Sequence, residues 1–257
     1  MAGGVTAEPG PPDDRAAELA ANLAAVRSRV AAACAGAGRD PAEVTLVAVT
    51  KTFGVDDVRR LVDLGVTDLG ENRDQEAAAK AASLAAALAA VAAPPDRPQA
   101  TVRWHFVGRL QRNKARSVAS YAYLVHSVDR AELLDPLAAG VRRAGHGPLG
   151  VLVQVSLDAD PGRGGAGPAD VPRLAAAVAE RADLRLRGVM AVAPMGADPD
   201  AAFAGLVRIA TAVRAVAPEA TLVSAGMSGD LEAAIRHGAT HVRVGTALLG
   251  GRPRLVG

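Results

Sequence analysis

The chain has 257 residues, of which half are hydrophobic and 22% are charged, a balance that is typical of globular proteins and excludes a chain that is disordered as a whole. Its net charge of +2 is too small to predict nucleic-acid binding, and a single cysteine, Cys34, excludes an internal disulfide and a cysteine-based zinc cluster. The chain also lacks an apolar stretch of membrane-spanning length and the pattern of a signal peptide, so we expect a protein of the reducing cytoplasm.

The N-terminal segment divides into a tail and a helix. Residues 1–13 are rich in Gly, Pro and Asp and are predicted to form a disordered tail. Residues 14–36 carry apolar side chains at spacings of three and four, which predicts an amphipathic helix. Cys34 lies in this apolar stretch, where we expect its thiol to be inert.

Eight short apolar runs follow, and most are separated from the next by a helical stretch. The runs are VTLVAV (44–49), VTDLG (66–70), VRWHFV (102–107), YLVHSV (123–128), LGVLVQV (149–155), LRLRGVMAV (184–192), ATLVSA (220–225) and HVRVG (241–245). The helical stretches include 55–64, 73–91, 130–144, 170–182, 199–217 and 229–237. Continuous apolar strands that alternate with helices indicate an α/β protein with a parallel sheet covered by helices.

Eight such units predict a single closed (β/α)₈ barrel over residues 14–257, although a doubly wound open sheet would show a similar alternation. One feature favours closure. Only GGRPRLVG follows the loop after the eighth strand, which is too short for an eighth covering helix. We expect the helix at 14–36 to fill the vacant place between the eighth and first strands.

In such barrels the loops after the C-terminal ends of the strands build the functional site. The first strand runs directly into Thr50, Lys51 and Thr52. A lysine that ends a buried strand needs an anionic partner, a lowered pKa or a covalent bond, unless its side chain reaches past the rim into water. Lys51 is therefore the leading candidate for a chemical role.

The loops after the seventh and eighth strands have the composition of a phosphate site. The first, SAGMSGD (224–230), is a Gly/Ser loop that leads straight into a helix, and the second, RVGT (243–246), adds a guanidinium and a hydroxyl. Each motif alone is a weak signal. Together with a lysine across the barrel mouth they indicate a phosphate-anchored carbonyl compound held as a Schiff base.

Six motifs occur in order over roughly residues 14–250: AVTKTF (48–53), GEN (70–72), WHFVGRLQRNK (104–114), RGVMAV (187–192), SAGMSGDLEAAI (224–235) and VRVGTALLG (242–250). With them the sequence resembles the pyridoxal-phosphate homeostasis protein family, which itself resembles the barrel half of alanine racemase without that enzyme's second domain. The resemblance implies a TIM barrel of the fold-type III kind and pyridoxal 5′-phosphate (PLP) as the cofactor.

The resemblance also implies roles for individual residues. Lys51 would hold PLP as a Schiff base, and Arg243 would face the pyridine nitrogen. The phosphate would be held by Ser228, Gly245 and Thr246, together with Ser224. The other positions implied to bind the cofactor or to lie near it are Asn72, His105, Met190, Gly226 and Met227.

These implications favour a non-enzymatic PLP carrier that buffers a reactive aldehyde and serves PLP-dependent apo-enzymes, its candidate partners. An arginine at the pyridine nitrogen leaves the ring a weak electron sink, and we expect no second domain to supply an opposing base. The alternative is a small PLP-dependent racemase or lyase. A barrel enzyme with a Schiff-base lysine and no PLP is a third hypothesis, but such enzymes usually place the lysine on a later strand. We expect a monomer.

Two positions depart from the family pattern near the barrel mouth. Arg73 stands where an aromatic residue is common, and the loop SLDADPGRGGAG (156–167) is long and rich in glycine. Residues 162–167 form a literal G-x-G-x-x-G, but Pro168 and Pro172 follow, which disfavours the helix of a dinucleotide-binding fold. We expect a mobile loop over the mouth instead.

A basic cluster and the histidines complete the candidates. The cluster lies in and before a short predicted helix and comprises Arg109, Arg112, Lys114 and Arg116. A solvated helix face is its first interpretation, followed by an anion-docking patch for an acceptor enzyme or for a second phosphate ligand, and then by RNA. His105 ends a strand. The other histidines, expected to be structural because they lack metal-ligand spacing, are His126, His146, His237 and His241.

Overall fold

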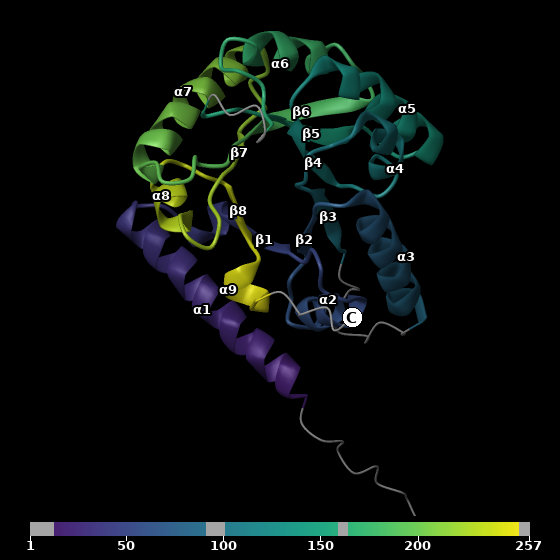
Figure 1. Ribbon diagram of the computed structural model, residues 1–257, viewed down its shortest axis with the longest axis vertical. Helices are drawn as coiled ribbons and strands as arrows, with labels where there is room; N and C mark the ends of the chain where they lie inside the picture. The colour runs from purple at the N-terminus through teal and green to yellow at the C-terminus, as the bar shows by residue number, and fades with distance from the viewer. Residues whose placement is uncertain (1–12, 91–100, 159–163, 252–257) are drawn as a thin grey trace, which may run out of the picture.

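Eight parallel strands hydrogen-bond to one another in chain order and close into a barrel in the computed structural model, which describes residues 13–90, 101–158 and 164–251 (Figure 1). The strands are β1 (Thr45–Val49), β2 (Asp68–Glu71), β3 (Arg103–Phe106), β4 (Leu124–Val128), β5 (Leu149–Gln154), β6 (Leu184–Met190), β7 (Leu222–Ser224) and β8 (His241–Val244). Ala48 of β1 pairs with Leu69 of β2 on one side and with Val244 of β8 on the other. The predicted barrel is therefore confirmed, and the open doubly wound sheet is excluded.

Helices follow the strands and form the outer ring. The α-helices are α1 (Asp14–Gly36), α2 (Val55–Asp63), α3 (Asp74–Ala90), α4 (Ala115–Val118), α5 (Leu134–Ala144), α6 (Val171–Ala179), α7 (Pro199–Val216), α8 (Leu231–Arg236) and α9 (Thr246–Leu249). Short 3₁₀ turns are η1 (Pro41–Glu43), η2 (Arg112–Lys114) and η3 (Ala131–Leu133). None of the helices within the described ranges is long and apolar enough to cross a bilayer.

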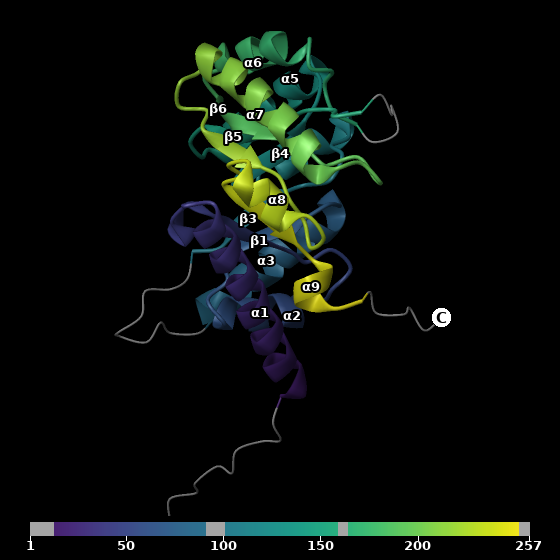
Figure 2. The ribbon, with the colours of Figure 1, turned by 90° about the vertical axis from the view of Figure 1, so that its left-hand side faces the viewer.

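The N-terminal helix occupies the place predicted for it. Helix α1 packs against α8 and α9, beside the junction of β8 and β1 (Figure 2). Its apolar stripe, which includes Leu19 and Leu23, belongs to the same buried cluster as Leu231 and Leu248. Cys34 lies in this stripe, and burial raises the pKa of its thiol, which agrees with an inert residue. The predicted tail, apart from Asp13, lies outside the described residues.

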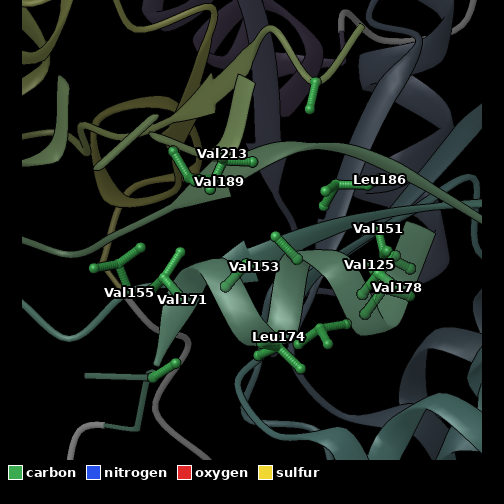
Figure 3. Close-up of a cluster of buried hydrophobic side chains, with 14 of the residues drawn as sticks. Val125, Val151, Val153, Val155, Val171, Leu174, Val178, Leu186, Val189 and Val213 are labelled. Carbon is green, nitrogen blue, oxygen red and sulfur yellow. The ribbon is translucent and has the colours of Figure 1, made fainter. Parts of the chain in front are cut away.

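The main core lies between the sheet and the helices. Valines on the outer face of β5, such as Val151 and Val153, are fully buried near α6 residues such as Leu174 and Val178, and Val189 of β6 lies beside Val213 of α7 (Figure 3). β-branched side chains suit this layer because they pack densely on a pleated surface. With only 2% aromatic residues, the chain builds this layer mainly from Val, Leu and Ala.

The barrel interior is lined in a different way. Side chains alternate between the two faces of a strand, so Val242 and Val244 of β8 join the outer apolar layer while His241 and Arg243 face inward. A small apolar cluster that includes Leu152 and Met190 is separate from the outer core. The interior therefore carries buried polar and charged groups, which lie below the mouth of the barrel.

Candidate functional site

Lys51 is positioned by the alternation of side chains along β1. Thr50 turns outward and hydrogen-bonds to Glu71, so Lys51 continues the inward row of Val47 and Val49 at the mouth. The sequence contains three lysines, and Lys51 is the one that follows directly after a strand. Its amine makes no hydrogen bond or ion pair within the described part of the chain. A partly exposed, unpaired primary amine at this place is suited to react with a carbonyl group.

A buried ion-pair network holds the backbone on both sides of Lys51. Lys80 of α3 donates hydrogen bonds to Glu71 Oε1 (2.7 Å), to Glu76 Oε1 (2.7 Å) and to the carbonyl oxygen of Thr50 (2.8 Å). Glu76 in turn accepts the backbone N–H of Thr52 at 2.7 Å. The residues immediately before and after Lys51 are thus attached to the same cluster of charges.

The network maintains two costly features. Thr52 has a φ of 70°, a left-handed conformation that costs about 1 kcal/mol or more in a β-branched residue. Burial raises the pKa of Glu71, although the hydrogen bonds from Lys80 and Thr50 favour its charged form. Such strain and buried charge persist where surrounding contacts over-determine the geometry, and they are typical of functional sites.

The loops after β7 and β8 lie side by side at the mouth. Ser228 Oγ accepts the backbone N–H of Ala247 at 3.3 Å, which joins the two loops. Within the described ranges, the backbone N–H groups of Ser228, Gly229, Gly245 and Thr246 have no protein acceptor. These free donors, with the hydroxyls of Ser228 and Thr246, match the oxygens of a phosphate.

Two contacts fix the shape of the Ser228 loop. Gly226 has a φ of +88°, and a Cβ atom there would lie 2.6 Å from the Cβ of Ala234, so no other residue fits without displacement. On the outer side, Arg29 of α1 donates to the carbonyl oxygen of Ser228 at 2.9 Å and pairs with Glu232. The N-terminal helix therefore supports the loop in addition to closing the outer ring.

Arg243 lies below these loops in the barrel interior. Its Nη1 donates to Ser224 Oγ at 2.6 Å and its Nη2 to the carbonyl oxygen of Ala191 at 2.9 Å. Burial lowers the pKa of the guanidinium to about 10, with Asp230 opposing the shift, so it stays charged at neutral pH. No carboxylate among the described residues forms an ion pair with Arg243, which leaves a positive charge for a ligand.

Two of the residues predicted to bind the cofactor lie deep in the barrel. His105 is fully buried, and its two ring nitrogens lie 2.9 Å from Asp68 Oδ1 and 2.9 Å from His126 Nε2. Ser224 is also fully buried, between His126 and Arg243. Their direct contact with a cofactor stays a prediction. Ser224 contacts Arg243 directly, whereas His105 is connected to it only through His126 and Ser224.

The remaining predicted residues surround the same mouth. Asn72 follows β2, and its Oδ1 is buried without a hydrogen-bond partner among the described residues, so it is available to a ligand. Met190 ends β6 beside Ser224 of β7 and is 2% exposed. Met227 is 40% exposed on the loop that ends at Asp230. These positions agree with a shared site, but their individual roles stay predictions.

The other candidates lie around the rim. Arg73, Arg109, Arg112 and Arg116 are exposed, which agrees with a solvated face. Helix α6 begins at Val171, so the last glycine of the G-x-G-x-x-G pattern does not open a helix, and residues 159–163 of that loop lie outside the described residues. No group of His, Cys, Asp or Glu in the described ranges is arranged to hold a metal ion.

The sequence interpretation missed Lys80, Asp68 and the role of His126. Lys80 is the only charged residue in an alanine-rich stretch of α3, AAAKAASLAAALAA, and such a helix face buries easily. Asp68 and His126 sit at inward positions of β2 and β4. The signal in the sequence was a polar residue at a strand position whose side chain points into the barrel, because buried polar groups need hydrogen-bonding partners.

Comparisons with known proteins identify the family. The chain matches the family described as alanine racemase, N-terminal domain, over residues 18–253. It is 47% identical to the pyridoxal phosphate homeostasis protein of Mycobacterium tuberculosis, over 93% of this chain and 95% of the relative. The protein of the same name from Pseudomonas aeruginosa is 42% identical, over 91% of this chain and 96% of the relative.

Solved structures agree with this assignment. The structure of PipY of Synechococcus elongatus with PLP bound has a TM-score of 0.75 and 33% identity, and the match covers 90% of this chain and 100% of PipY. A D-threonine aldolase from Filomicrobium marinum, at 18% identity and a TM-score of 0.69 over 91% of this chain and 60% of the aldolase, shows the shared fold alone. The chain therefore belongs to the pyridoxal phosphate homeostasis protein family, whose barrel is that of the alanine racemase N-terminal domain.

Proposed function

We propose that this protein binds PLP covalently at Lys51 and maintains PLP homeostasis by buffering and delivering it, without acting as an enzyme. The observation that carries the proposal is the unpaired amine of Lys51 at the end of β1, a strand that pairs with β8, so that Lys51 shares the mouth with the free donors of the Ser228 and Thr246 loops. The names of the relatives and the PLP bound to PipY support the choice of ligand.

The residues present fit the cofactor. Ser228, Gly229, Gly245 and Thr246 offer backbone N–H groups that the described residues leave free, and these suit the phosphate. Arg243 offers a charged donor below the mouth, and Asn72 Oδ1 is a buried acceptor without a partner among the described residues. When bound, PLP supplies an aldehyde that forms a covalent link with an amine and a ring that can withdraw electrons.

Arg243 favours storage over fast catalysis. A guanidinium can donate hydrogen bonds but cannot accept them, so Arg243 could not accept a hydrogen bond from a protonated pyridine nitrogen of PLP. Enzymes that need a strong electron sink place a carboxylate at this position. Arg243 therefore supports a carrier more than a racemase or lyase, the alternative function for this fold.

Delivery requires partners, which we propose to be PLP-dependent apo-enzymes that accept PLP from a monomeric carrier in the cytoplasm. The exposed arginines near the mouth, Arg109, Arg112 and Arg116, are the candidate surface for such an encounter. Their charge would raise the rate of association with an acidic partner, and this contribution would fall as the salt concentration rises.

The assignment of Lys51 is tested by reduction. The purified protein incubated with PLP should absorb visible light, and borohydride should fix a pyridoxyl group on the peptide that contains Lys51. Because the chain has three lysines, the other two serve as internal controls: Lys80 is buried and Lys114 is half-buried. Lys51→Ala should abolish the absorbance and Lys114→Ala should retain it. A pyridoxyl group on Lys80 or Lys114 with Lys51 unmodified would exclude the proposed site.

A further inference from the structure

A continuous chain of hydrogen bonds crosses the interior of the barrel below the mouth. It connects five side chains from five strands, in the order Arg243, Ser224, His126, His105 and Asp68, with successive distances of 2.6, 2.9, 2.9 and 2.9 Å. Ser224 lies on β7 and His126 on β4, which are not neighbours in the barrel, so this bond passes through the interior. All five residues are at most 5% exposed.

The charge of Asp68 determines where the protons lie. Burial opposes ionisation of Asp68, but hydrogen bonds from His105 and Arg103 outweigh it and lower its pKa to about 2. An ionised carboxylate can only accept, so His105 Nε2 must carry a proton. In a neutral His105 the other nitrogen, Nδ1, is then bare and must accept from His126 Nε2–H.

The protons on His126 and Ser224 are fixed in the same way. Burial lowers the pKa of His126 well below its ordinary value, and the nearby charge of Arg243 adds to this shift, so this ring is neutral and its Nδ1 is bare. Ser224 O–H must therefore donate to His126 Nδ1, and Ser224 Oγ accepts from Arg243 Nη1. In this order every donor in the chain meets an acceptor.

The reverse order leaves a proton without a partner. If His126 donated to Ser224, Ser224 Oγ would accept from both His126 and Arg243. Its own hydroxyl proton would then have no acceptor, because the described residues offer Ser224 Oγ no third partner. A buried donor without an acceptor is disfavoured, because the loss of its hydrogen bonds to water is not compensated. The reverse order would also require a charged His105.

The other ionisable groups around the chain do not compete with this arrangement. His241 has its ring 6.1 Å from that of His105 and bonds to Thr240, and burial lowers its pKa to about 4. Arg103 is bound to Asp68 at 2.6 Å, and Asp230 acts on Arg243 only through space. The chain therefore has one charged end at Asp68 and one charged end at Arg243, with the two histidines between them.

We propose that Asp68, His105 and His126 are positioning residues that hold the guanidinium of Arg243 in place through Ser224, by a one-directional chain of hydrogen bonds with both histidines in the neutral Nε2–H form. The consequence for PLP rests on the proposed function, in which Arg243 faces the ring of the cofactor. The carboxylate of Asp68 lies at the far end of the chain, so the guanidinium of Arg243 is held in place without direct contact with a negative charge.

The proton positions are tested on the protein without PLP. With ¹⁵N-labelled histidine, NMR at pH 7 should show His105 and His126 as neutral Nε2–H tautomers, with signals assigned from the variants His105→Gln and His126→Asn. A charged ring at either position, or an Nδ1–H tautomer of His126, would overturn the proposal. This measurement does not depend on whether the protein binds PLP.

The positioning of Arg243 is tested with matched variants of two buried histidines. His126→Leu breaks the chain, His126→Asn restores an acceptor near the position of Nδ1, and His241→Leu is a control of equal size outside the chain. In the protein without PLP, hydrogen exchange of the Arg243 Nε–H should accelerate at least about tenfold in His126→Leu, as expected for loss of one bond to a charged group. His126→Asn should reverse most of this change, and His241→Leu should resemble the wild type. Equal exchange in His126→Leu and the wild type would refute the positioning role.

A titration with PLP separates this inference from the proposed function. His126→Leu should raise the Kd for PLP about tenfold or more and shift the visible absorption maximum, while His241→Leu changes both little. If His126→Leu fails to fold, Asp68→Asn replaces it in both measurements. If the wild type binds no PLP, the proposed function fails, and the exchange and NMR results still decide the positioning chain. Unchanged affinity and spectrum in a folded His126→Leu would contradict the link to PLP.

Discussion

Replacement of Lys80 by methionine removes the cation that joins the two ends of the Lys51 segment. The Lys80 side chain is 8% exposed, and its ammonium group bonds to two carboxylates and one carbonyl oxygen. Methionine has a similar length and can fill the space, so the substitution removes the charge with little change in packing. Glu71, at 1% exposure, would lose its only cation within the described residues.

The expected loss follows from the burial of Glu71. Removal of one partner of a buried ion pair costs about 3–5 kcal/mol, because the remaining charge is left without compensation. Glu71 Oε1 would keep the hydrogen bond from Thr50 Oγ at 2.6 Å, so we expect about 3 kcal/mol, near the lower end. The folded-state pKa of Glu71 is already raised by burial and would rise further without Lys80, so the loss relative to the wild type should be smaller at acidic pH, where both folded proteins hold the proton, and should grow as the pH rises through the raised folded-state pKa of wild-type Glu71.

Urea unfolding at pH 7, with a double-mutant cycle, measures this cost. Glu71→Gln removes the stranded charge, so the double variant Lys80→Met/Glu71→Gln should lose about 1–3 kcal/mol less than the sum of the single losses. Lys114→Met, at a half-buried lysine, should stay within about 0.5 kcal/mol of the wild type. The Kd of Lys80→Met for PLP should also rise, because Thr50 and Thr52 lose their shared anchor. A loss below about 1 kcal/mol for Lys80→Met, or additive effects in the cycle, would refute the argument.

Three further predictions follow from the site. Asp68, whose pKa is lowered to about 2, should stabilise the fold fully above the unfolded pKa of about 4 and lose this contribution as the pH falls toward 2, so Asp68→Asn should show a flatter acid dependence in urea unfolding. Ser228→Ala and Thr246→Val should each weaken PLP binding by about 1–3 kcal/mol, and pyridoxal without the phosphate should bind far more weakly; equal affinities in direct titration would exclude the phosphate site. Incubation with L- or D-alanine in deuterated water should give little α-deuteration by NMR, whereas exchange at about 1 s⁻¹ or faster that disappears in Lys51→Ala would establish an enzyme.

Local patterns in the sequence were sufficient to predict the elements of the fold. Helix α1 and the strands are encoded by short-range periodicity, in which apolar residues recur at helical spacing or form continuous buried runs. The predicted residues Lys51, Ser228 and Thr246 could also be found in the sequence, because in this fold the site residues follow directly after strands. Individual boundaries moved by a few residues, as in β7, which spans Leu222–Ser224 within the predicted run 220–225.

The partners of the buried polar residues depend on tertiary structure. Lys80 is an isolated lysine in an alanine-rich helix, and its contacts with Glu71 and Thr50 arise only when α3 packs against the ends of β1 and β2. His126 and Ser224 are 98 residues apart in the chain and meet because the closed barrel brings β4 and β7 to opposite sides of a narrow interior. Sequence alone determined which strand faces His126 and Ser224 occupy, since alternation is local. Closure and register decided which of them touch, because these depend on how all eight strands pair at once.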